Sequence, residues 1–367
     1  MSINAKLTAG LVTGAFVLGL GLARSAFAQA SGDMTPELNA LAAAATKEGQ
    51  LVVKWSSQSF GGPQGAKVFE KHINENYGSS IQIRWTPGGA MPDVGNEIAI
   101  AFRNNQPAST DVYIGFSRNI AVLLKYDMFQ SGDYKKYLPG RITDEIVERD
   151  TYAKVYSSAA GISYNKTRAP FVPERLADLL KPGWKGKIAT TPFAAGFELL
   201  ASNDALGPEK AIALAEDYSK QVAGFMLCND ADRLASGEFI AFAFDCGGNR
   251  MVHAAAKGAP IARSLVPEVP VISYFYLAVP KNATNPNAAK LFITYALSEK
   301  GQRDLWDLEM SDLHLFPESN VRKEILAVEQ KFGFKYKSAD IDWQVSANEA
   351  GNAAQRKIVE ILKEGRR

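Results

Sequence analysis

The side chains best suited to hold a small ligand follow the predicted strands of the N-terminal half. In an open α/β sheet, ligands bind beyond the carboxyl ends of the strands, where helices that begin there point free N–H groups at small anions. Five residues directly follow the apolar segments 51–55, 81–85 and 111–115, namely Ser56, Ser57, Gly89, Ser117 and Arg118. An arginine binds a carboxylate or phosphonate through two hydrogen bonds, so Arg118 predicts an organic anion as ligand.

The C-terminal half offers a second set of ligand-binding candidates at strand ends and at a long apolar strand. These residues are Thr191, Gly196, Asp245, Asn249, Tyr274 and Tyr276. Several candidates have a structural alternative that the sequence leaves open. Ser56 and Ser57 suit a helix cap, Arg118 suits a solvated helix end, and either tyrosine suits a core.

Catalytic and metal motifs are missing from the sequence. The segment GFSRN at 115–119 ends in Asn119, so it is not the G-x-S-x-G turn of a serine hydrolase, and no HExxH occurs. The three histidines, His72, His253 and His314, show no metal-ligand spacing. We therefore expect a binding protein without catalytic residues, metal or cofactor.

The charge balance excludes nucleic acid as a partner. The chain has 41 Lys and Arg residues against 39 Asp and Glu residues, without a basic block. Segment 1–28 holds two of the basic residues, Lys6 and Arg24, and no acidic residue, so removing it leaves 39 of each sign. A neutral chain of this kind lacks the positive surface that phosphate backbones need.

The N-terminus has the three parts of a secretory signal peptide. Lys6 precedes the apolar run 7–22, and the small-x-small sequence Ala26-Phe27-Ala28 precedes Gln29. The alternative, a membrane anchor, needs about 20 apolar residues, and this run is shorter. No cysteine follows the run for lipid attachment. We expect cleavage near Ala28 and release into the periplasm.

The two cysteines, Cys228 and Cys246, each end an apolar run, VAGFMLC and FIAFAFDC. If these runs are neighbouring strands, a disulfide between their ends is expected in the oxidising periplasm, and it would stabilise the fold by about 3 kcal/mol. Two unpaired buried thiols are the alternative, because sequence does not reveal the separation of the Cα atoms.

The elements that position these residues alternate along the chain. Thr35-Pro36-Glu37 begins a helix that stops at Gly49, and strands at 51–55, 81–85 and 111–115 alternate with helices. This rhythm predicts an α/β fold with a mainly parallel sheet. Roughly 340 residues remain after cleavage, which is enough for two domains of ordinary size.

Five segments resemble one family, the extracellular solute-binding proteins of the ferric-iron, thiamine or phosphonate type. They are KEGQLVVKWSS, DVYIG, GISYNKT, ERLADLLKPGWKGKIATT and NPNAAKLFITYALSEKGQ, within residues 45–305. The resemblance implies a type II periplasmic-binding-protein fold with two α/β lobes joined by two crossover strands. Lobe one would hold 29–157 and 275–367 with the C-terminal helices, lobe two 163–268, and the hinges 157–164 and 269–276.

The same resemblance implies the function. The protein would be the monomeric, periplasmic substrate-binding component of an ABC import system, which closes about its hinge on a small solute and presents it to a permease in the inner membrane. Ferric-binding relatives hold iron with an adjacent tyrosine pair after the strand that here ends FAFDC, and this chain has Asp245 to Asn249 there instead. We therefore expect an organic anion. The alternatives are a ferric-ion-binding protein of an iron importer and a binding protein that presents its ligand to a membrane receptor for sensing.

Overall fold

The computed structural model describes residues 34–57, 59–347 and 349–365. The predicted signal peptide and its cleavage site near Ala28 lie outside the described residues. In the described part of the chain, no helix is long and apolar enough to cross a membrane.

The N-terminal part alternates helices and strands, as predicted. The elements are α1 (Pro36–Glu48), β1 (Gln50–Trp55), α2 (Gly62–Tyr77), β2 (Gln82–Pro87), α3 (Met91–Arg103), β3 (Tyr113–Phe116) and α4 (Ser117–Leu123). The predicted start of α1 is confirmed, because the Thr35 hydroxyl accepts a hydrogen bond from the Leu38 N–H at 3.1 Å. Strands β1 and β2 pair in parallel. The Asp111 carboxylate joins them to the next segment by accepting from the Val52 N–H at 2.7 Å.

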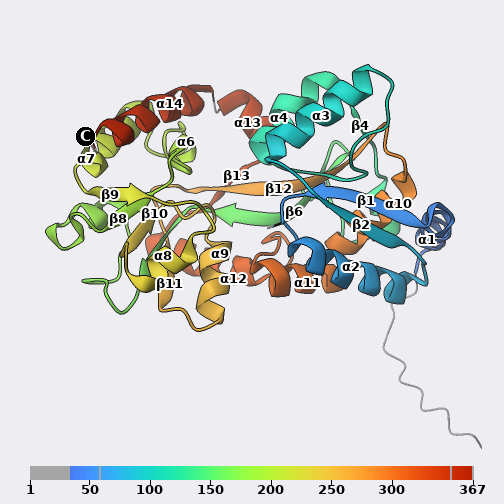
Figure 1. The fold of residues 1–367 in the computed structure, drawn as a ribbon, viewed down its shortest axis with the longest axis horizontal. Helices are drawn as coiled ribbons and strands as arrows, with labels where there is room; N and C mark the ends of the chain where they lie inside the picture. The colour runs from blue at the N-terminus through green and yellow to red at the C-terminus, as the bar shows by residue number, and fades with distance from the viewer. Residues whose placement is uncertain (1–33, 58, 348, 366–367) are drawn as a thin grey trace, which may run out of the picture. The chain divides into compact units, whose positions relative to one another are not determined.

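A six-stranded sheet forms the centre of this part. Strand β12 (Val271–Pro280) pairs with β6 (Tyr152–Ala159), β3, β4 (Phe129–Gln130) and β13 (Lys337–Ala339), and β5 (Val147–Glu148) pairs with β6. Figure 1 shows β12 and β6 side by side along the middle of the described chain. One core of buried side chains surrounds this sheet and the β1–β2 pair, and it includes Trp55, Phe69 and Phe292.

A five-stranded sheet forms the second centre. Its strand order is β11 (Ile261–Leu265), β7 (Gly161–Asn165), β10 (Ala241–Ala243), β8 (Ile188–Thr190) and β9 (Val222–Phe225). Its helices are α6 (Phe197–Leu200), α7 (Pro208–Ser219), α8 (Ala231–Ser236) and α9 (Asn249–Ala256). A separate core lies here, with Trp184, Phe197 and Tyr218 buried.

The expectation of a mainly parallel arrangement is wrong. β12 runs antiparallel to β3, β4 and β6, and β7 runs antiparallel to β10 and β11. The reason is the path of the chain. It leaves the six-stranded sheet through β6, enters the five-stranded sheet through β7, and returns through β11 and β12, so each outgoing strand lies beside a returning one.

The C-terminal helices differ from the expected placement. α10 (Pro286–Leu297), α11 (Glu299–Glu309) and α12 (Asn320–Phe332) precede β13, and α13 (Ile341–Ala347) packs on α4. The last helix, α14 (Glu349–Glu364), packs instead on α7 and α6 beside the five-stranded sheet (Figure 1). Its Ala354, Ile358 and Leu362 belong to the core of that sheet, so the chain crosses between the sheets a third time.

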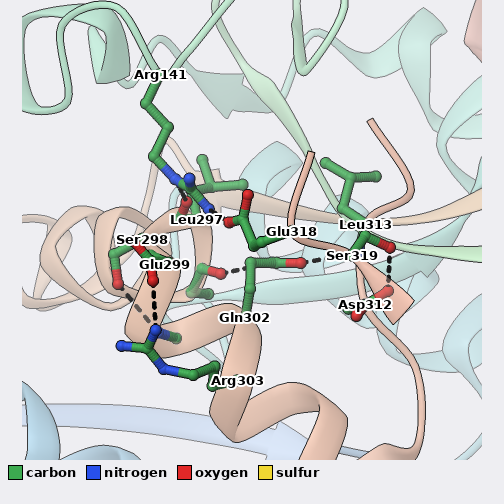
Figure 2. A network of polar contacts seen from close by, with 12 residues as sticks. Arg141, Leu297, Ser298, Glu299, Gln302, Arg303, Asp312, Leu313, Glu318 and Ser319 are labelled. Carbon is green, nitrogen blue, oxygen red and sulfur yellow. Dashed lines mark hydrogen bonds and ion pairs between the residues drawn. The ribbon is translucent and has the colours of Figure 1, made fainter. Parts of the chain in front are cut away.

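A polar network fixes the segment that follows α11 (Figure 2). The Gln302 amide donates to the carbonyls of Val155 at 3.0 Å and Ala296 at 2.8 Å. Its oxygen accepts from the Leu313 N–H at 2.7 Å. The segment is thereby held against β6, the strand that leads to the first crossing.

Candidate functional site

A cavity of about 270 Å³ lies where the two sheets meet. The end of β3, the middle of β12 and the N-termini of α3 and α4 supply one wall. The loop before α6 and the turns after β9 and β10 supply the other. The chain passes through the junction at Ala160, which lines the cavity between β6 and β7. The cavity therefore occupies the place where a ligand would contact elements of both sheets.

Four phenylalanines, Phe116, Phe193, Phe244 and Phe275, line the cavity. Phe116 and Phe275 meet edge to face with ring centroids 5.0 Å apart, and Phe275 also stacks on Tyr156 at 4.4 Å. On the opposite wall Phe244 packs against Phe197 at 4.7 Å, which fixes its ring. A side chain held by such packing keeps its position when a ligand arrives. The cavity thus offers rigid apolar faces for the body of an organic molecule.

The predicted disulfide is confirmed and forms part of this cavity. Cys228 and Cys246 are bonded, with their Cα atoms 5.7 Å apart, and both residues line the cavity. The condition assumed for the bond is wrong, because β9 and β10 are not neighbours and β8 lies between them. The bond forms beyond the strands, because Cys228 and Cys246 lie three residues after the ends of β9 and β10.

One cation and one anion face each other in the cavity. Arg118 Nη1, at the start of α4, lies 3.7 Å from Glu198 Oε1 in α6. The Arg118 side chain is 41% exposed, whereas that of Glu198 is 7% exposed. Gln355 of α14 donates to the second carboxylate oxygen of Glu198 at 3.0 Å. Burial raises the pKa of the Glu198 carboxyl, and Arg118 offsets part of the rise.

Two of the predicted site residues, Arg118 and Gly196, line this cavity. Gly196 has a φ of 82° and precedes α6 where an added Cβ would contact the Phe244 ring at 2.7 Å. A larger residue there would require both an unfavourable backbone and a displaced ring. The glycine therefore allows the start of α6, the helix that carries Glu198, to pass close to Phe244.

Three other predicted residues, Ser117, Thr191 and Asp245, are engaged in internal contacts. The Ser117 hydroxyl donates to the Tyr274 carbonyl at 3.2 Å and accepts from its N–H at 3.1 Å, which fixes α4 to β12. The Thr191 hydroxyl accepts from the Ala195 N–H at 2.7 Å. Asp245 is buried and pairs with Arg263 at 2.7 Å.

The remaining predicted residues lie away from the lining of this cavity. Tyr274 and Tyr276 are buried in the core of the six-stranded sheet, where Tyr274 stacks on His314 and Tyr276 donates to Glu148. Asn249 donates to Glu309 at 3.3 Å. The last three, Ser56, Ser57 and Gly89, lie beyond the ends of β1 and β2.

Sequence reasoning missed the other residues that shape the cavity. Glu198 lies two positions after the predicted Gly196, but its apolar context, GFELL, is typical of a buried helix. Gln355 comes from a helix far along the chain, and no local pattern connects it with residues 193–198. Phe116 could have been found from the sequence, because it directly follows the predicted strand 111–115 and precedes the predicted residues Ser117 and Arg118.

The segment where ferric relatives place tyrosines is occupied by other interactions. Asp245 is ion-paired with Arg263, and Cys246 is in the disulfide. Within the residues that the structure describes, no three His, Cys, Asp or Glu side chains are grouped as a metal ion would require.

Solved structures of similar fold include a substrate-binding protein of an ABC transporter and a periplasmic binding protein. PotD of Streptococcus pneumoniae, from a spermidine/putrescine transporter, is 15% identical with a TM-score of 0.62, and the match covers 87% of this chain and 99% of that one. Iron-bound HitA of Pseudomonas aeruginosa is 14% identical with a TM-score of 0.62 and coverages of 84% and 99%. AfuA of Actinobacillus pleuropneumoniae, with fructose-6-phosphate bound, is 17% identical with a TM-score of 0.57 and coverages of 86% and 97%. The expected type II periplasmic-binding-protein fold is thereby confirmed.

The sequence itself places the chain in a family. No curated protein sequence matches it. The family model described as bacterial extracellular solute-binding protein matches residues 125–331. Because this match spans more than half of the 367 residues, the chain belongs to the bacterial extracellular solute-binding proteins, whose periplasmic members serve ABC transporters.

Proposed function

We propose that this protein captures a small organic molecule with an anionic group in the cavity between its two sheets and delivers it to an ABC importer. The single observation that carries the proposal is the placement of Arg118. This arginine lines a cavity to which four phenylalanines also contribute, and its side chain remains partly exposed. A guanidinium so placed can hold a carboxylate or phosphonate while the rings pack on the rest of the molecule.

The division into two lobes supports ligand capture by closure. We propose that the six-stranded sheet and the five-stranded sheet centre two lobes, with hinges at the β6–β7 and β11–β12 connections. The lobes would close on the ligand, and the closed form would dock on a permease in the inner membrane. In this proposal the protein acts as a monomer in the periplasm after cleavage near Ala28.

The ligands named for proteins of similar fold do not select one class, because they include an iron ion and a sugar phosphate. The contacts of this chain favour an organic ligand over iron. The segment after β10, where a tyrosine pair would bind Fe(III), is engaged in the Arg263–Asp245 ion pair and the disulfide. Four phenyl rings line the cavity instead, from Phe116, Phe193, Phe244 and Phe275.

A thermal-shift screen of the purified mature protein tests the proposal. The screen would contain carboxylates, phosphonates, amines, vitamins and metal ions, because a molecule that binds only the folded state raises the melting temperature. For an anionic hit, Arg118→Ala is expected to weaken binding more than tenfold by calorimetry, with an unchanged circular-dichroism spectrum. The matched control is Arg84→Ala, which removes an exposed arginine of β2. Unchanged affinity in Arg118→Ala would remove this residue from the site.

A further inference from the structure

The charges that line the cavity are balanced. Among its lining residues that the structure describes, Arg118 and Glu198 are the only ionisable side chains. Their closest atoms are 3.7 Å apart, which is longer than a hydrogen bond between charged groups, at 2.7–2.9 Å. The two groups attract each other without a direct hydrogen bond. The Glu198 carboxylate also accepts hydrogen bonds from Gln355 and from the backbone N–H groups of Gly196 and Glu198, and the partly exposed Arg118 guanidinium is accessible to a ligand.

Glu198 depends on Arg118 for charge compensation. Its side chain is 7% exposed, and an ionised carboxylate removed from water is unstable unless it is paired and hydrogen-bonded. Gln355 supplies one hydrogen bond, to Oε2, but no charge. Any ligand that draws Arg118 away therefore changes the stability of the Glu198 carboxylate as well.

A ligand with a single charge would fit this arrangement poorly. An anion at Arg118 would lie close to the Glu198 carboxylate, and two like charges at short distance in a partly buried site repel each other strongly. A cation at Glu198 would meet the same repulsion from Arg118. A ligand that carries both charges avoids both costs, because each of its groups compensates one protein charge.

The volume and the lining of the cavity narrow the class of ligand further. About 270 Å³ is small for a ligand cavity, since pockets that bind drug-sized molecules measure about 300–1,000 Å³. Because the two protein charges are neighbours, the two ligand charges must also be close together. The phenyl rings then leave an apolar space for the side chain that is attached to the charged groups of the ligand.

We infer that the cavity selects a zwitterion of the α-amino-acid type with an apolar side chain, its carboxylate on Arg118 and its ammonium on Glu198. The inference rests on the proposed function, because it requires that this cavity be the ligand site. It adds Glu198 as a second recognition group, positioned by Gln355, and it excludes plain anions as preferred ligands.

Three matched probe classes test the inference on the unaltered protein. They are apolar α-amino acids, including L-phenylalanine and L-leucine, the corresponding acids without the amine, including 3-phenylpropionate and 4-methylpentanoate, and the corresponding amines without the carboxylate, including phenethylamine and 3-methylbutylamine. At least one amino acid is expected to raise the melting temperature and to bind at least tenfold more tightly by calorimetry than both of its truncated forms.

Variants connect this binding to the two charges. Glu198→Gln is expected to weaken the amino acid at least tenfold and to strengthen the truncated acid, because it removes the like charge beside Arg118. Arg118→Gln is expected to weaken both. Glu97→Gln is the matched control, because Glu97 forms a surface ion pair with Lys54 and its side chain is 46% exposed. The comparison of probes on the unaltered protein remains decisive if a variant fails to fold.

The outcomes separate this inference from the proposed function. If the truncated acids bind as tightly as the amino acids and require Arg118 but not Glu198, the zwitterion inference is wrong and capture of an anion stands. The same holds if no amino acid binds while another anion binds through Arg118. If no anion or zwitterion in either screen binds in a manner that depends on Arg118, the proposed function itself is overturned.

Discussion

Arg118 Nη1 lies 3.7 Å from Glu198 Oε1, and the pair joins two helices that pack beside different sheets. Arg118 opens α4, which packs beside β12 of the six-stranded sheet, and Glu198 is in α6 on the side of the five-stranded sheet. Any change in the spacing of the sheets at this point alters the distance between the two charges. The electrostatics of the cavity are therefore coupled to the relative position of its walls.

Helix α14, which the chain forms after its third crossing between the sheets, is expected to stabilise the loop that precedes α6. Gln355 of α14 donates to the carbonyls of Phe193 and Ala194, both at 3.1 Å, and to Glu198 at 3.0 Å. Gln355→Leu should accelerate amide hydrogen exchange in residues 193–198 and lower the free energy of unfolding by about 1–2 kcal/mol. Equal exchange in variant and parent would show that the loop does not depend on α14.

The disulfide is expected to contribute about 3 kcal/mol to stability by restricting the unfolded chain. Its sequence separation is 18 residues. The double variant Cys228→Ala, Cys246→Ala should therefore unfold at lower urea than the oxidised parent. Reduction with dithiothreitol should lower the midpoint of the parent toward that of the variant and leave the variant unchanged. A parent midpoint that does not respond to complete reduction would contradict this expectation.

Gln302 is expected to be among the least replaceable polar residues of the core. The Gln302→Met variant keeps a similar volume but leaves the carbonyls of Val155 and Ala296 and the N–H of Leu313 without this partner. Loss of about 2–3 kcal/mol of unfolding free energy is expected in urea titrations, because buried polar groups without partners are costly. The matched control, Gln330→Met, alters an exposed glutamine of α12 and should change stability by less than about 0.5 kcal/mol. Equal stabilities of the two variants would refute the role assigned to Gln302.

His314 is expected to make stability depend on pH in the acidic range. Burial, followed by the nearby cations Arg322 and Lys154, lowers the pKa of His314 from 6.5 to about 4. The unfolded chain therefore binds a proton more readily than the folded one, so the stabilising effect of the neutral ring is present above pH 6.5 and is lost as pH falls toward 4. The lost stability should be about 3 kcal/mol for this group.

The comparison that isolates this effect uses His314→Gln. The ring of His314 stacks on Tyr274 and its Nδ1 contacts the Ser157 hydroxyl at 2.7 Å, so the variant will be less stable at pH 7. Between pH 7 and pH 4.5, however, the free energy of unfolding should fall more steeply in the parent than in the variant. Parallel pH profiles in urea titrations would exclude His314 as the source.

Local chemistry made much of the fold predictable. A helix start such as Thr35-Pro36 and a stop such as Gly49 act within a few residues, so α1 has the predicted ends. The pairing of Cys228 with Cys246 was also predictable, because these are the chain's two cysteines and an oxidising compartment favours their bond. The direction of strand pairing was not, since it depends on the path by which β6 and β12 pass between the sheets.

The sequence by itself determined the class of this protein, its alternating helices and strands, its likeness to solute-binding proteins, and Arg118 as a charge at a strand end. Only the tertiary structure decided which of the candidate residues share a cavity. In the structure Ser117, Asp245 and both tyrosines make internal contacts. Glu198 lies beside Arg118, and Gln355 donates to Glu198. The physical reason is range: caps, turns and periodicity act between near neighbours in sequence, whereas a binding cavity is formed by charges and rings that only the packing of distant segments brings together.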